Sequence, residues 1–172
     1  MVKTILFKTI IILAISVIAG NYVYAQNATT TKSNSLDSTR AQNFYVELGG
    51  PGIIFSANYD TRFSNTQDGL GGRVGIGGLS SGSSSIFTMP LQLNYLLGKD
   101  DKFFEIGVGV TINSGNIGGI FNSSTIGTMV FGYRLQPKNS GFSFRAFVSP
   151  VFDGSNFTPY FVGLSFGYSF HN

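Results

Sequence analysis

The feature of this sequence that most constrains its fold is an alternation of apolar and other side chains with a period of two residues. From Asn43 to the C-terminus the alternation occurs in eight segments, and none shows the period of an amphipathic helix. One face of the segment 104–112 consists of Phe104, Ile106, Val108, Val110 and Ile112. Most segments are close to the roughly 9–11 residues that a tilted membrane-spanning strand requires. We therefore predict an all-β chain of eight antiparallel strands.

The charged residues inside these segments lie on the face opposite the apolar one. They are Glu47, Asp60, Arg62, Arg73, Glu105, Arg134 and Arg145. The rest of this face is rich in Gly and Ser, which suits the narrow interior of an eight-stranded barrel. Charged residues make up only 11 % of the chain, against about 25 % in a typical soluble domain. We therefore predict a transmembrane up-and-down antiparallel β-barrel with apolar side chains facing lipid. The alternative is a soluble barrel of the lipocalin type, with its apolar side chains inside.

Two kinds of turn alternate along the chain. Residues 64–69, 98–102 and 136–141 form tight, polar and charged turns, which we expect at the periplasmic end. Residues 50–52, 80–85, 114–124 and 153–156 are rich in Gly, Ser or Asn, and we expect them as loops at the outer end. The last of these separates a seventh segment that reaches Phe152 from an eighth that begins at Tyr160. The longest loop, 114–124, carries Ile117, Ile120 and Phe121 as a candidate contact surface. Alternatively, these three side chains pack on the barrel rim or enter the lipid headgroups.

Residues 1–25 have the three parts of a secretory signal peptide. Lys3 and Lys8 precede an apolar run over 9–20, and Val23-Tyr24-Ala25 places small or modest side chains before a cleavage point. The run is shorter than the roughly 20 residues of a membrane-spanning helix, so we expect cleavage and export through the secretory pathway. Residues 26–42 have almost no apolar side chains and are predicted to be a disordered leader. The barrel is then expected over 43–172.

The composition also excludes several kinds of chemistry. Loss of Lys3 and Lys8 with the signal peptide leaves a net charge of only +1, so no basic surface is expected to bind nucleic acid. The absence of Cys and the single His exclude zinc fingers, iron–sulfur centres and most His-dependent catalysis. Two stretches, 78–82 and 163–167, match G-x-S-x-G, but that motif needs a strand-to-helix turn and a nearby His. We expect no catalytic residue, no metal, no cofactor and no enzyme activity.

The stretches 46–52 (VELGGPG), 93–99 (LNYLLGK) and 163–170 (GLSFGYSF) carry a resemblance. Residues 43–172 resemble the small eight-stranded outer-membrane β-barrel proteins of Gram-negative bacteria. Within the ending, Gly163 followed by Phe166, Tyr168 and Phe170 looks like the assembly signal of such barrels. The resemblance implies a place in the outer membrane among its lipids and lipopolysaccharide. It also implies delivery by periplasmic chaperones and insertion by the barrel assembly machinery, but no particular activity.

The seven inward charges, four Arg and three acids, are nearly balanced. An unpaired charge is costly in a poorly hydrated interior, and eight strands leave room only for packed side chains. We therefore predict an ion-pair network that fills the lumen of a monomeric, non-enzymatic protein with a structural or surface-interaction role. The alternative is a narrow, porin-like passage for small solutes, in which the excess of Arg favours anions.

Overall fold

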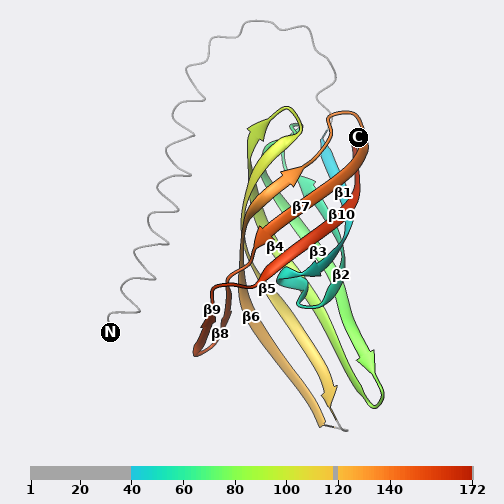
Figure 1. The fold of residues 1–172 in the computed structure, drawn as a ribbon, viewed down its shortest axis with the longest axis vertical. Coiled ribbons are helices and arrows are strands. Elements are labelled where there is room, and N and C mark those ends of the chain that lie inside the picture. Colours follow the sequence, from blue (N-terminus) through green and yellow to red (C-terminus); the bar gives the residue numbers. More distant parts are fainter. Residues whose placement is uncertain (1–39, 118–119, 172) are drawn as a thin grey trace, which may run out of the picture. The chain divides into compact units, whose positions relative to one another are not determined.

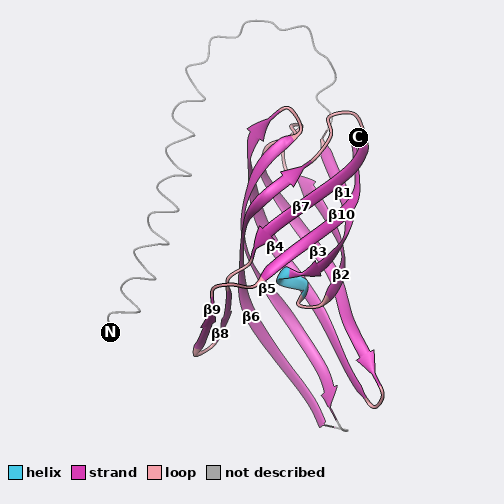
Figure 2. Ribbon diagram, viewed as in Figure 1, coloured by secondary structure: helices cyan, strands magenta, loops and turns pink. Residues whose placement is uncertain are grey.

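A computed structural model describes residues 40–117 and 120–171, so the predicted signal peptide and most of the predicted leader lie outside the described residues. The strands are β1 (Ala41–Gly49), β2 (Phe55–Arg62), β3 (Gly69–Ser81), β4 (Ser84–Lys99), β5 (Lys102–Ile117), β6 (Ile120–Leu135), β7 (Gly141–Val148), β8 (Val151–Asp153), β9 (Asn156–Thr158) and β10 (Val162–His171). A 3₁₀ turn, η1 (Gly50–Gly52), follows β1 (Figure 2). The described part of the chain has no helix that is long and apolar enough to cross a membrane.

Eight of these strands close a barrel. Each lies antiparallel to its neighbours in the order β1-β2-β3-β4-β5-β6-β7-β10, and β10 pairs back onto β1 from Ala41↔His171 to Gly49↔Gly163 (Figure 1). Strands β8 and β9 form a small hairpin, and β8 pairs with β6 of the wall at Gly127↔Phe152 and Thr128↔Val151. The predicted eight-stranded up-and-down barrel is therefore confirmed.

The two faces of the wall differ in chemistry, because successive side chains of a strand point to opposite sides of a sheet. Outward-facing side chains are apolar and exposed, as at Phe44 (55 %) and Val108 (56 %). Inward-facing side chains are mainly polar, and all seven predicted inward charges are at most 3 % exposed. A barrel with apolar side chains outside and polar side chains inside is suited to a lipid bilayer and not to water. The structure thus contradicts the alternative of a soluble barrel with an apolar interior.

The strand ends differ from the sequence prediction. β1 begins two residues earlier than expected, at Ala41. The predicted loops 80–85 and 114–124 are largely strand, because β3 and β4 pair up to Ser81↔Ser84, and β5 and β6 pair up to Ile117↔Ile120. The prediction of a long loop at 114–124 was therefore wrong. Ser, Asn and Gly favour turns in isolation, but backbone hydrogen bonds to a neighbouring strand extend this sheet whatever the side chains are.

The candidate contact residues of that segment are only partly visible. Ile120 is 66 % exposed at the start of β6. The side chains of Ile117 and Phe121 lie outside the described residues, as do residues 118–119.

Candidate functional site in the barrel lumen

The seven inward charged residues meet inside the barrel, although they come from six different strands. Each positive side chain contacts a negative one, so that the charges alternate along one continuous chain of ion pairs. The order of the chain is Arg62, Asp60, Arg134, Glu105, Arg145, Glu47 and Arg73. We call this set the lumen ion chain.

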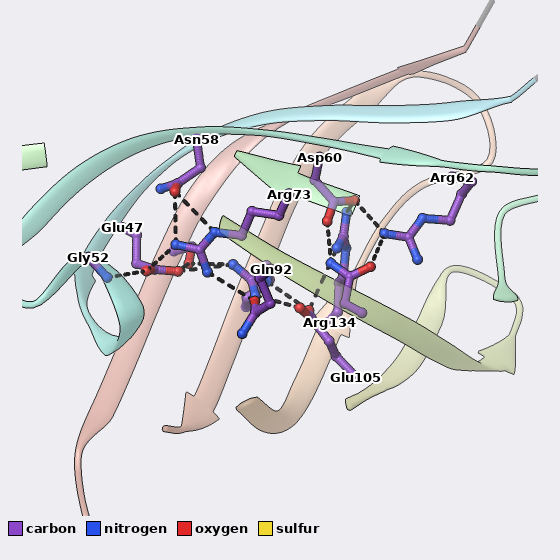
Figure 3. Close-up of polar contacts among 12 residues, drawn as sticks. Glu47, Gly52, Asn58, Asp60, Arg62, Arg73, Gln92, Glu105 and Arg134 are labelled. Atoms are coloured by element: carbon purple, nitrogen blue, oxygen red, sulfur yellow. Dashed lines mark hydrogen bonds and ion pairs between the residues drawn. The ribbon is translucent and has the colours of Figure 1, made fainter. Parts of the chain in front are cut away.

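One end of the lumen ion chain is centred on Asp60 of β2. Its Oδ1 accepts hydrogen bonds from Nη2 of Arg62 at 2.6 Å and from Nη2 of Arg134 at 2.8 Å (Figure 3). The side-chain amide of Asn94 donates to the other carboxylate oxygen. Both oxygens of this buried carboxylate are therefore satisfied by donors from three other side chains.

The middle of the chain is the pair formed by Glu105 of β5 and Arg145 of β7. Arg145 donates from Nε to Oε2 at 2.8 Å and from Nη2 to Oε1 at 2.6 Å. This two-bond arrangement is the geometry that a guanidinium and a carboxylate match best. Arg134 lies on the other side of Glu105, with Nη1 at 3.6 Å from Oε2.

The other end is centred on Glu47 of β1. Its Oε1 accepts a hydrogen bond from Nη2 of Arg73, and its Oε2 accepts one from Nη1 of Arg145 at 3.0 Å. The hydroxyl of Ser165 also donates to Oε2, at 3.2 Å. Asn58 holds Arg73 in place, since its Oδ1 accepts from Nε at 3.0 Å and from Nη2 at 2.8 Å (Figure 3).

Two inward aromatic side chains enclose Arg145. Its guanidinium carbon lies 4.6 Å from the ring centre of Tyr45 and 4.8 Å from that of Phe147, within the range of cation–π attraction. Neither ring was predicted from the sequence to lie in the lumen. Their position could have revealed them, because Tyr45 is two residues from Glu47 and Phe147 two from Arg145, so each shares the inward face.

The turn η1 also occupies the lumen, a position that was not predicted from the sequence. Its three residues are buried, and two hydroxyls of the opposite wall bind its carbonyl oxygens. Thr111 donates to the carbonyl of Pro51 at 2.7 Å, and Thr88 donates to that of Gly52 at 3.1 Å. The predicted loop at 50–52 does connect β1 to β2 at the end opposite the tight turns. It folds inward instead of projecting, because buried strands there can satisfy its backbone.

This inward turn requires glycine at two positions around Phe147. Gly50 has φ +63°, and a Cβ placed on it would lie 2.5 Å from the Phe147 ring. A Cβ on Gly163 of β10 would lie 2.4 Å from the same ring. The predicted assembly-signal glycine therefore has a packing reason as well, since the ring fills the space beside it.

The remaining predicted residues lie on β10 or away from the lumen. Phe166 and Tyr168 face outward and are 41 % and 56 % exposed, and Phe170 is half-buried. Their part in assembly stays a prediction. Neither G-x-S-x-G serine lies on a strand-to-helix turn: Ser80 is in β3, and Ser165 binds Glu47 and Arg145. Across the described ranges no three metal-binding side chains come together.

The barrel is similar to known structures, although no protein-family model and no curated protein matches the chain. The N-terminal β-barrel domain of Pseudomonas aeruginosa OprF superposes with a TM-score of 0.57 at 12 % identity, covering 78 % of this chain and 98 % of that one. Neisserial surface protein A (NspA) gives 0.48 at 14 % identity, with coverage of 77 % and 96 %. The attachment invasion locus protein Ail of Yersinia pestis gives 0.40 at 15 %, with coverage of 77 % and 97 %. At these identities the likeness to the OprF domain establishes the fold, and the lumen residues must be interpreted from this chain itself.

Proposed function

We propose that this chain, which has the fold of the small eight-stranded outer-membrane barrels, is an integral outer-membrane protein of a Gram-negative cell. Its lumen is closed by side chains, it is not an enzyme, and its role is structural or in contacts at the cell surface. The observation that carries the proposal is the lumen ion chain, which joins six of the eight barrel strands through buried contacts.

The lumen ion chain and η1 together support a closed interior. Every charged side chain of the network is at most 3 % exposed, and η1 is bound between Glu47 and the hydroxyls of β4 and β5. A solute could pass only after several buried ion pairs separate and η1 leaves its position, and each separation would leave unpaired charges in a poorly hydrated interior. We therefore expect no steady ion current through the folded barrel.

The outer wall supports the membrane location. Its apolar side chains form a continuous lipid-facing surface, and Tyr59, Tyr95 and Tyr133 lie on it near the tight turns. Aromatic residues at that level are typical of the membrane interface of β-barrels. The proposal also includes export through the secretory pathway, delivery by periplasmic chaperones, insertion by the barrel assembly machinery and a monomeric state.

The outer end supports a surface role. There β3, β4, β5 and β6 continue past the last residues that pair with β2 and β7, as a four-stranded sheet (Figure 1). No charged residue occurs over 74–98 or 106–133. The projecting part is rich in Ser, Thr and Asn but also exposes Leu79, Phe87 and Ile120. It therefore presents an uncharged surface of polar and apolar side chains outside the lipid.

Conductance in planar lipid bilayers tests whether the lumen is closed. We expect no ion current from the folded protein at voltages that open no defects in the membrane. The porin-like alternative predicts a steady current that is lost in Gly107→Leu, because Gly107 faces the lumen and a Cβ on it would lie 3.0 Å from the Gln92 side chain. Such a current, blocked by that substitution, would show that the lumen conducts.

Gel mobility in SDS tests the membrane barrel separately. Closed barrels keep all their backbone hydrogen bonds internal and leave no edge exposed, so the unheated protein should migrate differently from the boiled one. The same band should be found in the outer-membrane fraction. Recovery from the soluble periplasm with no change on boiling would contradict the proposal.

A further inference from the structure

The β8–β9 hairpin leaves the barrel where the outer wall changes from apolar to polar. On β6 the outward-facing residues run from Met129 through Gly127 to the exposed Thr125 and Ser123. Phe152 of β8 pairs with Gly127 at this boundary. From there the hairpin projects sideways, away from the wall (Figure 1).

The hairpin and its return to β10 expose an unusual amount of apolar surface. Phe157 is 55 % exposed, Tyr160 is 86 % exposed and Val162 is 64 % exposed. The rings of Phe152 and Phe157 stack at 4.6 Å. The charged residue nearest to them in the sequence is Asp153, beside the tip at Gly154 and Ser155. The hairpin is therefore apolar and aromatic at its base and polar at its tip.

A ribbon of this size is not expected to be stable in water without a surface to pack on. It has three residues in each strand and two pairings to the wall, and even longer two-stranded hairpins are marginal in water. A contiguous exposed apolar patch marks a surface that contacts something else. Tyr combines an apolar ring with a polar hydroxyl and concentrates at membrane interfaces, and aromatic residues in general form girdles at the interfaces of membrane β-barrels.

We propose that the β8–β9 hairpin is a membrane-interface anchor. Its aromatic base lies among the outermost acyl segments of the outer leaflet, and its tip lies among the headgroups. This inference rests on the proposed membrane location of the barrel. The partner is a lipid surface, because the exposed apolar residues of the hairpin adjoin the apolar outer wall: Phe152 pairs with Gly127 of β6, and the exposed Val162 of β10 pairs with the exposed Val148 of β7. One sector of the barrel wall is thereby held at a fixed depth in the bilayer.

Single-tryptophan variants test this proposal, because the chain contains no Trp. Phe157→Trp and Tyr160→Trp report on the hairpin. Phe131→Trp reports on the lipid-facing wall, and Ser83→Trp reports on the polar β3–β4 turn. Each full-length mature variant is folded into phosphatidylcholine vesicles, with or without bromine at shallow or deep acyl positions. Fluorescence is then measured with and without acrylamide.

We expect Phe157→Trp and Tyr160→Trp to emit at shorter wavelength than Ser83→Trp. They should lose most of their fluorescence to shallow bromines and less to deep ones. Ser83→Trp should respond to acrylamide and not to bromine. If the hairpin tryptophans match Ser83→Trp, or respond to neither quencher while Phe131→Trp is quenched by bromine, the anchor is refuted and the membrane barrel stands. If Phe131→Trp also escapes bromine, both the anchor and the membrane location are refuted.

Discussion

Replacing Arg145 by Leu should destabilise the barrel more than any other single change in the lumen ion chain. Arg145 makes two hydrogen bonds to Glu105 and one to Glu47, and it is 1 % exposed. Leucine keeps much of the apolar volume between Tyr45 and Phe147 but removes the charge that both carboxylates share. The effect therefore reports mainly on electrostatics.

The size of the effect follows from what the two carboxylates keep. Glu47 retains Arg73, but Glu105 is left with Arg134 alone, at 3.6 Å. Removing one partner of a buried ion pair costs about 3–5 kcal/mol. With a urea dependence of about 2 kcal/mol per molar, the unfolding midpoint should fall by about 2 M. Arg62→Leu should cost less, because Arg62 ends the chain and Asp60 keeps Arg134.

Urea titration of the protein folded in phosphatidylcholine vesicles, followed by the band shift in unheated gels, measures this difference. Lys138→Ala is the matched control, since Lys138 is 62 % exposed and lies 3.8 Å from Asp100. Exposed pairs of this kind contribute at most about 1 kcal/mol. The double variant Arg145→Leu/Glu105→Gln should recover part of the loss. An Arg145→Leu midpoint equal to that of Lys138→Ala would refute the view that these ion pairs hold the strands together.

Three further outcomes follow from the lumen and its glycines. Gly50→Val should strongly reduce the fraction of protein whose gel mobility shifts on boiling, because the valine side chain would meet the Phe147 ring and φ at this position is +63°. Gly82→Val is the control for backbone strain alone, since Gly82 has φ +57° and open space around it. Gly163→Ala should likewise lower the urea midpoint, and Phe147→Leu should restore part of it if the ring is the cause. Thr111→Val should cost about 1–3 kcal/mol in the same titration, because it leaves the carbonyl of Pro51 buried without a donor, whereas an unchanged midpoint would mean that η1 is not held by this bond.

The barrel could be predicted from the sequence because each strand of its wall carries a local pattern of alternating side chains. In each strand, alternate positions are apolar, and a slip of one residue would place charges such as Glu105 or Arg134 in lipid. Strand number, direction and the inward face of the charged residues all follow from this local pattern. Tyr45 and Phe147 could have been assigned to the lumen by the same rule.

The parts that were mispredicted have no such pattern. Residues 114–124 lack the alternation that marks a strand, because Ile117, Ile120 and Phe121 occur among Ser, Asn and Gly without a period of two. β5 and β6 nevertheless pair there through their backbones. Phe152 and Tyr160 fit the alternation of the seventh and eighth segments, but the structure places them in β8 and in the connection to β10. Whether such a short segment continues its own strand or pairs with a neighbouring one depends on residues far away in the chain.

The alternation along the sequence is therefore enough to predict a barrel with an apolar outside and a charged inside, because side-chain direction in a strand depends only on position along it. The tertiary structure alone decided which charges meet. Glu47 and Arg145 are 98 residues apart in sequence and form an ion pair at 3.0 Å, since barrel closure brings β1 within reach of β7. It also decided that η1 turns into the lumen, because only the assembled wall supplies Thr88 and Thr111 to bind it.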